Sequence, residues 1–162
     1  MSALGIGFAA MNYWLMKSEP TTFSVDALAA SPKQTTAWDG VRNFQARNML
    51  RDEVKKGDLV FLYHSSCEVP GVVGVMEVVR EGYPDATQFD PKDDHYDPDS
   101  RREDPRWYCV DVQLKRKFKR IITLEELRAH RRLANLKLLQ RGNRLSVMPV
   151  TKTEWDYVLS LE

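Results

Sequence analysis

The sequence lacks the long hydrophobic runs and the paired cysteines that mark membrane-spanning and disulfide-stabilised proteins. No stretch of its 162 residues approaches the ~20 apolar residues of a membrane span, so we expect no membrane partner. The apolar opening segment is short for a secretory signal and lacks a basic region. Cys67 and Cys109 form no C-x-x-C motif and no set of pairs, which predicts a reduced, cytoplasmic setting.

Motifs of the common enzyme classes and cofactor sites are also missing. The segment GVVGV lacks the Lys-Ser/Thr pair of a phosphate loop, and neither G-x-S-x-G nor H-E-x-x-H occurs. His64 and Ser65 are adjacent on a predicted strand, so their side chains point to opposite faces and cannot easily share a proton. The segment DDHYD, residues 93–97, has cation ligands but lies in an acidic loop without cysteines. We therefore expect no catalytic residue, no metal and no cofactor.

The composition is that of a folded domain with an uneven distribution of charge. Hydrophobic residues make up 43% and charged residues 29% of the chain, which are ordinary values, and its length fits one domain. We expect residues 1–11 to be a tail or tag-like extension and residues 12–162 to be that domain. Residues 113–144 hold eleven Lys or Arg against two Glu, whereas residues 81–111 hold ten acidic against four basic residues. Such polarity either guides a polyanion to one face or forms a solvated surface of mixed charge.

Hydrophobic patterns predict short strands and helices in an irregular order. Strands are predicted at residues 13–17, 35–38, 58–64, 70–80, 107–118 and 144–150, and helices at residues 25–30, 44–54, 123–130 and 151–161. Strands outnumber helices and do not alternate regularly with them, so an α+β fold with a mixed, barrel-like sheet fits better than a Rossmann fold. Residues 81–106 contain four prolines and no apolar periodicity, which predicts a long loop that is functional or mobile.

Aromatic and hydrogen-bonding side chains gather at the ends of the predicted strands. Trp38 ends the second strand within the stretch AWDGVRNFQARN, where its polar neighbours indicate a rim position rather than a core position. A sheet fixes the side chains at its strand ends, and an aromatic wall with a few polar groups suits a flat ligand such as a nucleobase. Asn43 offers both a donor and an acceptor for a base edge. Taken singly, each of these residues has an ordinary alternative role in packing or turn capping; the others are Lys17, Ser18, Tyr63, His64 and Ser65.

Seven segments resemble the motifs of the EVE domain, a family of PUA-like fold, and occur in the expected order. They are YWLMKSEPTTFS, WDGVRNFQARN, GDLVFLYHSS, GVVGVMEVV, YPDATQFDP, RWYCVDV and RLSVMPVT, and the resemblance runs from about residue 12 to residue 161. The resemblance implies an α+β fold, a PUA-like mixed β-pseudobarrel with surrounding short helices, and a pocket for a modified nucleobase. Related PUA-like readers hold a methylated base, flipped out of its strand, in an aromatic cage.

The resemblance also implies roles for individual residues. Trp38 becomes the cage wall, Gly40 lets the backbone turn beside it, and Asn43 and Ser18 are candidates for reading the base edge. The second cage aromatic is Tyr83, Tyr96 or Trp107. The complete expected ligand-binding set is Lys17, Ser18, Trp38, Gly40, Val41, Asn43, Tyr63, His64, Ser65 and Ser146. The expected contacts to the nucleic-acid backbone are Arg42, Lys115, Lys117, Lys119, Arg120, Arg141 and Arg144.

The leading interpretation is a non-enzymatic module that recognises a modified, methylated base in DNA or RNA by flipping it into the pocket. A binder of a free nucleoside or similar heterocycle is the alternative, and only the polymer reader should weaken steeply as salt rises. An enzyme that uses His64 or Asp39 as acid or base is the third interpretation, and it lacks a recognisable catalytic constellation. A nuclease or methylase that uses the domain as an adaptor fits the reader interpretation, and the sequence leaves the oligomeric state open.

Overall fold

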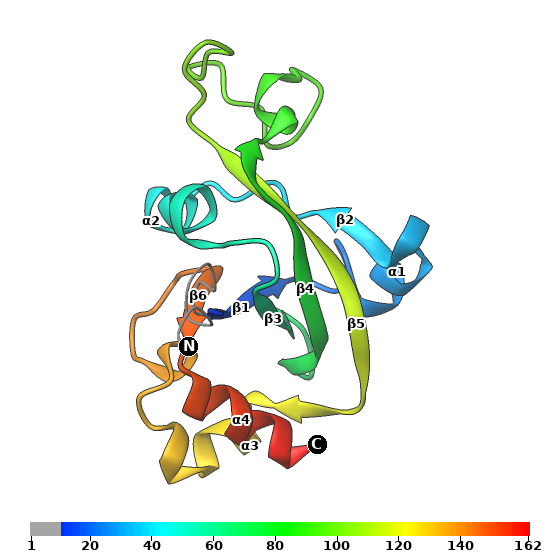
Figure 1. Ribbon diagram of the computed structural model, residues 1–162, viewed down its shortest axis with the longest axis vertical. Coiled ribbons are helices and arrows are strands. Elements are labelled where there is room, and N and C mark those ends of the chain that lie inside the picture. Colours follow the sequence, from blue (N-terminus) through cyan, green and yellow to red (C-terminus); the bar gives the residue numbers. More distant parts are fainter. Residues whose placement is uncertain (1–10) are drawn as a thin grey trace, which may run out of the picture.

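The computed structural model describes residues 11–162, in which six strands form one open, mixed sheet (Figure 1). The strand order is β2-β5-β4-β3-β1-β6, and only β1 and β3 of these neighbours run parallel. The bounds are Tyr13–Ser18 (β1), Thr35–Ala37 (β2), Leu59–His64 (β3), Gly71–Pro84 (β4), Tyr108–Thr123 (β5) and Val147–Val150 (β6). The expected tail falls on residues that the structure does not describe, apart from Met11, and stays a prediction.

The two edge strands are too short to close the sheet into the barrel that the sequence predicts. β2 pairs with β5 over three residues and β6 pairs with β1 over four, and within residues 11–162 no ladder joins β2 to β6. The long ribbon of β4 and β5 contains four register shifts, which bend and twist it. The sheet is therefore strongly curved but open.

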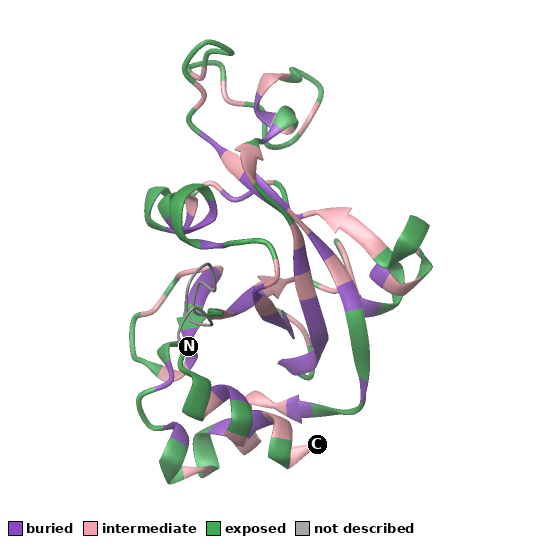
Figure 2. Ribbon diagram, in the orientation of Figure 1, coloured by how far each residue is buried: buried purple, intermediate pink, exposed green. Residues whose placement is uncertain are grey.

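Alternate residues of the central strands form two hydrophobic cores on opposite faces of the sheet. Trp14 and Met16 of β1 belong to the first core, whereas Leu15 belongs to the second, because successive strand side chains point to opposite faces. Helices α1 (Val25–Ala30) and α2 (Phe44–Asn48) contribute to the first core. Helices α3 (Leu124–Ala129) and α4 (Lys152–Leu161) contribute to the second. Figure 2 shows the buried residues concentrated along the strands and the inner sides of these helices.

Capping threonines fix the starts of two helices. The Thr151 hydroxyl accepts a hydrogen bond from the Glu154 N–H, and the Glu154 carboxylate accepts one from the Thr151 N–H, so α4 begins with a complete capping box. Thr123 caps α3 in the same way, but the carboxylate of Glu126 binds Arg120 instead of closing the box. No helix in the part of the chain described here is long and apolar enough to cross a membrane. Shorter helical turns lie at Pro32–Gln34 (η2), Met49–Glu53 (η3, a π-helical turn that continues α2), Ala86–Phe89 (η4), Arg131–Leu133 (η5) and Lys137–Leu139 (η6).

The segment predicted as a loop, residues 81–106, begins inside β4 and then forms an ordered excursion beyond the end of the β4–β5 ribbon (Figure 1). Gln88 is fully buried within it. Its Nε2 donates to the Trp107 carbonyl oxygen at 2.9 Å, and its Oε1 accepts from the Trp107 N–H at 3.1 Å. The indole N–H of Trp107 donates to Asp97 at 2.7 Å. Hydrogen bonds from polar side chains keep this segment ordered. Such bonds do not recur at a regular spacing in the sequence, so the hydrophobic pattern could not predict this order.

Candidate functional site

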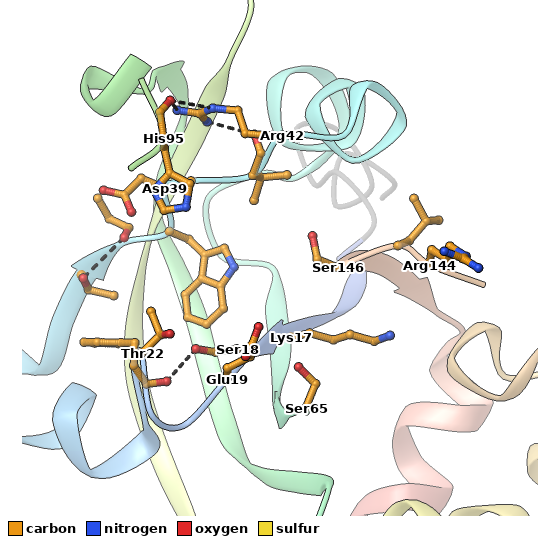
Figure 3. A pocket seen from close by; sticks show the side chains of 17 residues that line it. Lys17, Ser18, Glu19, Thr22, Asp39, Arg42, Ser65, His95, Arg144 and Ser146 are labelled. Atoms are coloured by element: carbon orange, nitrogen blue, oxygen red, sulfur yellow. Dashed lines mark hydrogen bonds between the residues drawn. The ribbon is translucent and has the colours of Figure 1, made fainter. Parts of the chain in front are cut away.

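A pocket of about 600 Å³ opens where the ends of β1, β2 and β3 meet the segment that precedes β6 (Figure 3). This volume is typical of pockets that enclose small organic ligands. Seven of the ten predicted ligand-binding residues line it, together with two of the predicted backbone contacts. They are Lys17, Ser18, Trp38, Gly40, Val41, Ser65 and Ser146, with Arg42 and Arg144.

Trp38 is part of the pocket wall and part of the first hydrophobic core at the same time. Its side chain is only 7% exposed and packs in that core, although the sequence predicted a ring turned to a ligand rather than to the core. The backbone N–H of Trp38 donates to the Val110 carbonyl oxygen at 2.7 Å, which continues the β2–β5 pairing beyond the end of β2. The ring is thus held by packing and by the sheet before any ligand arrives, which lowers the ordering cost of binding.

The carboxylate of Asp85 holds the turn that follows Trp38. Asp85 is fully buried, and its Oδ2 accepts from the Gly40 N–H at 2.8 Å and from Arg42 Nη1 at 3.1 Å. Its Oδ1 accepts from the Thr87 N–H at 2.8 Å. Burial alone would raise the pKa of Asp85, but these hydrogen bonds together hold the pKa below its ordinary value. A buried charge therefore ties the pocket wall to the excursion after β4.

The guanidinium of Arg42 makes a second link between these two segments. Its Nε and Nη2 donate to the His95 carbonyl oxygen at 3.1 and 2.7 Å, as Figure 3 shows, and Nη2 also donates to Thr87 Oγ1 at 2.9 Å. Arg42 was predicted to contact the nucleic-acid backbone. In the structure its donors are directed at protein acceptors, so Arg42 positions the rim of the pocket.

His95 is a pocket residue that the sequence analysis did not select. It lies in the segment DDHYD, which was considered only as a cation site, and Figure 3 shows it beside Asp39 at one end of the pocket. Its ring covers Gly40, whose φ is +80° and where an added Cβ would approach His95 Cε1 to 2.9 Å. Loss of hydration in this wall, followed by the negative charge of Asp85, raises the pKa of Asp39.

Replacing Gly40 with alanine tests this close contact. The left-handed backbone costs an L-residue about 1–2 kcal/mol, and the methyl group must also displace the His95 ring. Gly57→Ala is the matched control, because Gly57 has a φ of +95° but open space around its Cα. We expect Gly40→Ala to lower the free energy of urea unfolding more than Gly57→Ala does. Equal losses in the two variants would show that the His95 contact contributes nothing.

Two backbone hydrogen bonds bring the other side of the pocket together. The Lys17 N–H donates to the Ser146 carbonyl oxygen at 2.9 Å, and the Ser65 N–H donates to the Ser18 carbonyl oxygen at 3.0 Å. The Ser18 hydroxyl donates to the Phe23 carbonyl oxygen at 2.6 Å, so it faces a ligand as an acceptor. Burial lowers the pKa of Lys17, which has no ion pair with any described residue. This side supplies the Lys17 ammonium group and several hydroxyl groups.

Three predicted pocket residues lie elsewhere in the structure. Asn43 caps α2, because its Oδ1 accepts from the Ala46 N–H at 2.9 Å. Tyr63 packs in the second core, whereas the Trp38 wall of the pocket belongs to the first. His64 Nε2 accepts from the Val25 N–H at 3.1 Å and so anchors the start of α1. Burial lowers the pKa of His64, which favours the neutral ring that this contact requires.

The second aromatic residue in the pocket lining is not one of the three that the resemblance suggested. Trp107 is buried and stacks on Phe44 with 4.7 Å between ring centroids, Tyr96 belongs to the excursion, and Tyr83 lies on β4; none of them lines the pocket. Phe23, from the turn after β1, lines it together with Trp38. Phe23 belongs to the motif YWLMKSEPTTFS, but the sequence of a turn does not indicate where an aromatic ring points.

The predicted contacts to the nucleic-acid backbone separate into two groups. The group on β5 is largely engaged in ion pairs: Lys115 with Glu77 at 3.4 Å, Lys117 with Asp26 at 2.6 Å, and Arg120 with Glu126 at 2.7 Å. Lys119 is exposed on the same strand. Arg141 and Arg144 form the other group, and they lie in the segment before β6, beside the pocket.

An open mixed sheet with a tryptophan-walled pocket at its strand ends is the architecture of a PUA-like binding domain. The chain belongs to the EVE domain family, whose profile matches residues 12–161. The membership inferred from seven motifs is thus confirmed, and so is the PUA-like fold, in which the curved sheet is open and not a closed barrel.

Several relatives of known name share the sequence and the fold. The chain is 50% identical to thymocyte nuclear protein 1 of Mus musculus over 168 residues, covering 93% of this chain and 74% of the relative. It superposes on the crystal structure of human THYN1 protein in complex with 5-methylcytosine containing DNA with a TM-score of 0.88, at 48% identity, covering 93% and 96% of the two chains. A protein from Pseudomonas syringae gives a TM-score of 0.88 at 44% identity, covering 92% and 98%.

These relatives correct the expected cellular location. Two isolated cysteines predicted a cytoplasmic protein, but the relatives at 48–50% identity are named thymocyte nuclear proteins, which points to the nucleus. A reduced environment is common to both compartments, so cysteine usage could not separate them.

Proposed function

We propose that this protein is a non-enzymatic reader that binds DNA carrying 5-methylcytosine, with the modified base flipped into the pocket beside Trp38. The observation that carries the proposal is this pocket of about 600 Å³, with Trp38 and Phe23 in its lining. It occurs in a fold that superposes on human THYN1 protein bound to 5-methylcytosine containing DNA. An aromatic wall offers a stacking face, and Ser18, Ser65 and Ser146 offer polar groups for a base edge.

The energies of the individual steps limit how strongly such a pocket selects a methyl group. Extruding a base from a duplex costs a few kcal/mol, which stacking of about 1–3 kcal/mol and hydrogen bonds to the base edge must offset. A buried methyl group adds about 0.8 kcal/mol, or roughly a fourfold preference over the plain base. The plain base is smaller than the methylated one, so shape cannot exclude it, and discrimination beyond this requires that the methyl group displace a poorly ordered water.

The contacts of His64 and Ser18 support binding rather than catalysis, whereas Asp39, the other candidate acid or base, lines the pocket. His64, one candidate acid or base, accepts the Val25 N–H and lies outside the pocket lining. The hydroxyl proton of Ser18 is donated to a backbone carbonyl, so this group is not prepared as a nucleophile. RNA as the target, and a nuclease or methylase partner, stay predictions from the sequence.

A titration with matched oligonucleotides tests the proposal. Short single- and double-stranded DNAs, each with one 5-methylcytosine or one plain cytosine at the same position, would be followed by tryptophan fluorescence at two salt concentrations. We expect tighter binding of the methylated DNA by about fourfold or more, and weaker binding at higher salt. Equal affinity for both DNAs would contradict recognition of the modification. Binding of free 5-methyl-2′-deoxycytidine as tight as that of the oligonucleotide would favour the small-ligand alternative.

A further inference from the structure

A second, smaller groove of about 380 Å³ continues from the base pocket. It lies between the start of α2 and the segment that runs from η6 to β6, and it shares Arg144 and Leu145 with the pocket. A chain that leaves the pocket on this side therefore enters the groove directly.

All charged side chains that line the groove are positive. Lys137, Arg141 and Arg144 line it, and its lining contains no aspartate or glutamate. None of the three has an ion pair among residues 11–162, in contrast to the lysine and arginine side chains on β5 that are neutralised by carboxylates. Adjacent cations without a partner repel one another, so an anion that enters the groove is favoured.

The basic side of the groove is held in place by one side chain. Asn143 donates from Nδ2 to the Lys137 carbonyl oxygen at 2.7 Å, and its Oδ1 accepts from the Leu145 N–H at 3.0 Å. Gly142, which directly precedes Asn143, adopts a φ of +79°, which lets the segment turn tightly. The cations are exposed, but the backbone that carries them is ordered by these contacts.

The opposite side of the groove provides neutral donors. Asn43 and Gln45 line it from the start of α2. The Oδ1 atom of Asn43 is used as the helix cap, which leaves its Nδ2 group as a donor. Asn43 was predicted to read a base edge, and the structure places it with the groove instead of the pocket.

We propose that this groove binds the phosphodiester backbone next to the flipped nucleotide, through Lys137, Arg141 and Arg144 on one side and the Asn43 and Gln45 amides on the other. The inference rests on the proposed function, because the pocket fixes where the strand begins. Phosphate contacts carry no sequence information, so the groove contributes affinity for a strand and not selectivity for the methylated base.

Charge removal at single positions tests the groove. We would measure the affinity of a single-stranded 5-methylcytosine oligonucleotide over a range of salt for Lys137→Gln, Arg141→Gln and Lys56→Gln. Lys56 is the matched control, because it is an exposed lysine that lines neither the groove nor the pocket. Each phosphate contact contributes about 0.7 to the slope of log K against log salt for a single strand. We expect the slope to fall by about this amount in Lys137→Gln and in Arg141→Gln and to stay unchanged in Lys56→Gln. A slope unchanged in both groove variants would overturn the proposal.

Free 5-methyl-2′-deoxycytidine separates the groove from the base pocket. It has no phosphodiester, so we expect all three variants to bind it like the parent protein. A loss of nucleoside affinity in the groove variants would assign these residues to the base pocket and overturn the groove as a backbone site. If the parent protein does not distinguish methylated from plain DNA, the proposed function fails, while the slopes measured on plain single-stranded DNA still decide whether the groove binds phosphates.

Discussion

Replacing Trp38 with leucine should weaken binding of a 5-methylcytosine oligonucleotide by about tenfold or more. The indole offers the flat face on which a flipped base would stack, and stacking on an aromatic side chain contributes about 1–3 kcal/mol, where 1.4 kcal/mol is a factor of ten. Leucine keeps part of the apolar volume but has no planar face. Trp38→Phe, which keeps an aromatic ring, should retain most of the affinity. The measurement is a titration of methylated DNA followed by fluorescence anisotropy.

The burial of Trp38 makes a stability control necessary. Truncating a buried tryptophan to alanine costs about 3–5 kcal/mol, which is the reason for choosing leucine instead. Trp155→Leu is the matched control. Trp155 is also buried, but it lies in the second core and stacks on Phe61 with 3.7 Å between the ring centroids. We expect both variants to unfold at lower urea and only Trp38→Leu to lose affinity. Full affinity in a folded Trp38→Leu protein would show that the base does not stack there.

The second large effect is expected at Asp85, because Asp85→Ala should destabilise the protein by about 2–4 kcal/mol. The carboxylate is fully buried and accepts from the Gly40 N–H, from Thr87 and from Arg42. Its removal leaves the two N–H groups without their acceptor and Arg42 without its charge partner. The loss should be measured as the free energy of urea unfolding. Asp94→Ala is the control, since Asp94 is an exposed aspartate of the same excursion.

The pH dependence of the free energy of unfolding should show the contribution of the Asp85 carboxylate. Because the pKa of Asp85 in the folded protein lies below its ordinary value, the charged form stabilises the fold. This contribution is complete above the unfolded pKa of about 3.9 and is lost as pH falls from there through the folded pKa. We expect the parent protein to lose more stability between pH 5 and pH 3 than Asp85→Ala does, since the variant has already lost this contribution. Parallel stability curves for the two proteins would contradict a stabilising charge at Asp85.

Asp85→Ala should also weaken DNA binding without any contact to the ligand. The turn from Asp39 to Arg42 forms part of the pocket wall, and the Asp85 carboxylate is the acceptor that holds its Gly40 N–H. A wall free to move must be ordered on binding, which lowers affinity. If Asp85→Ala loses stability and keeps full affinity under conditions where it is folded, the wall is held by Arg42 and His95 alone.

Local patterns in the sequence determined the secondary structure and the family. Short apolar runs at residues 13–17 and 58–64 predicted strands, and those strands build the two cores. The helix predicted at residues 151–161 matches α4, which Thr151 and Glu154 cap. Such features depend on neighbours in the chain, so one sequence is enough to find them.

Only the tertiary structure decided which predicted residues meet at the pocket. Tyr63 and His64 end β3, as predicted, but Tyr63 packs in the second core and His64 is used to anchor α1. The side of a strand end that faces a cavity depends on pairing with distant strands, which the local pattern does not contain. His95 likewise reaches the pocket through bonds to Arg42, 53 positions away in the chain.

The same division applies to charge. The sequence alone shows that residues 113–144 carry a large excess of positive charge. It could not show that β5 would place Lys117 beside Asp26 and Arg120 beside Glu126, whereas Lys137 and Arg141 would line a groove without carboxylates. Charges interact through space over a few ångströms, so the fold and not the order of residues determines which cations are neutralised and which can bind an anion.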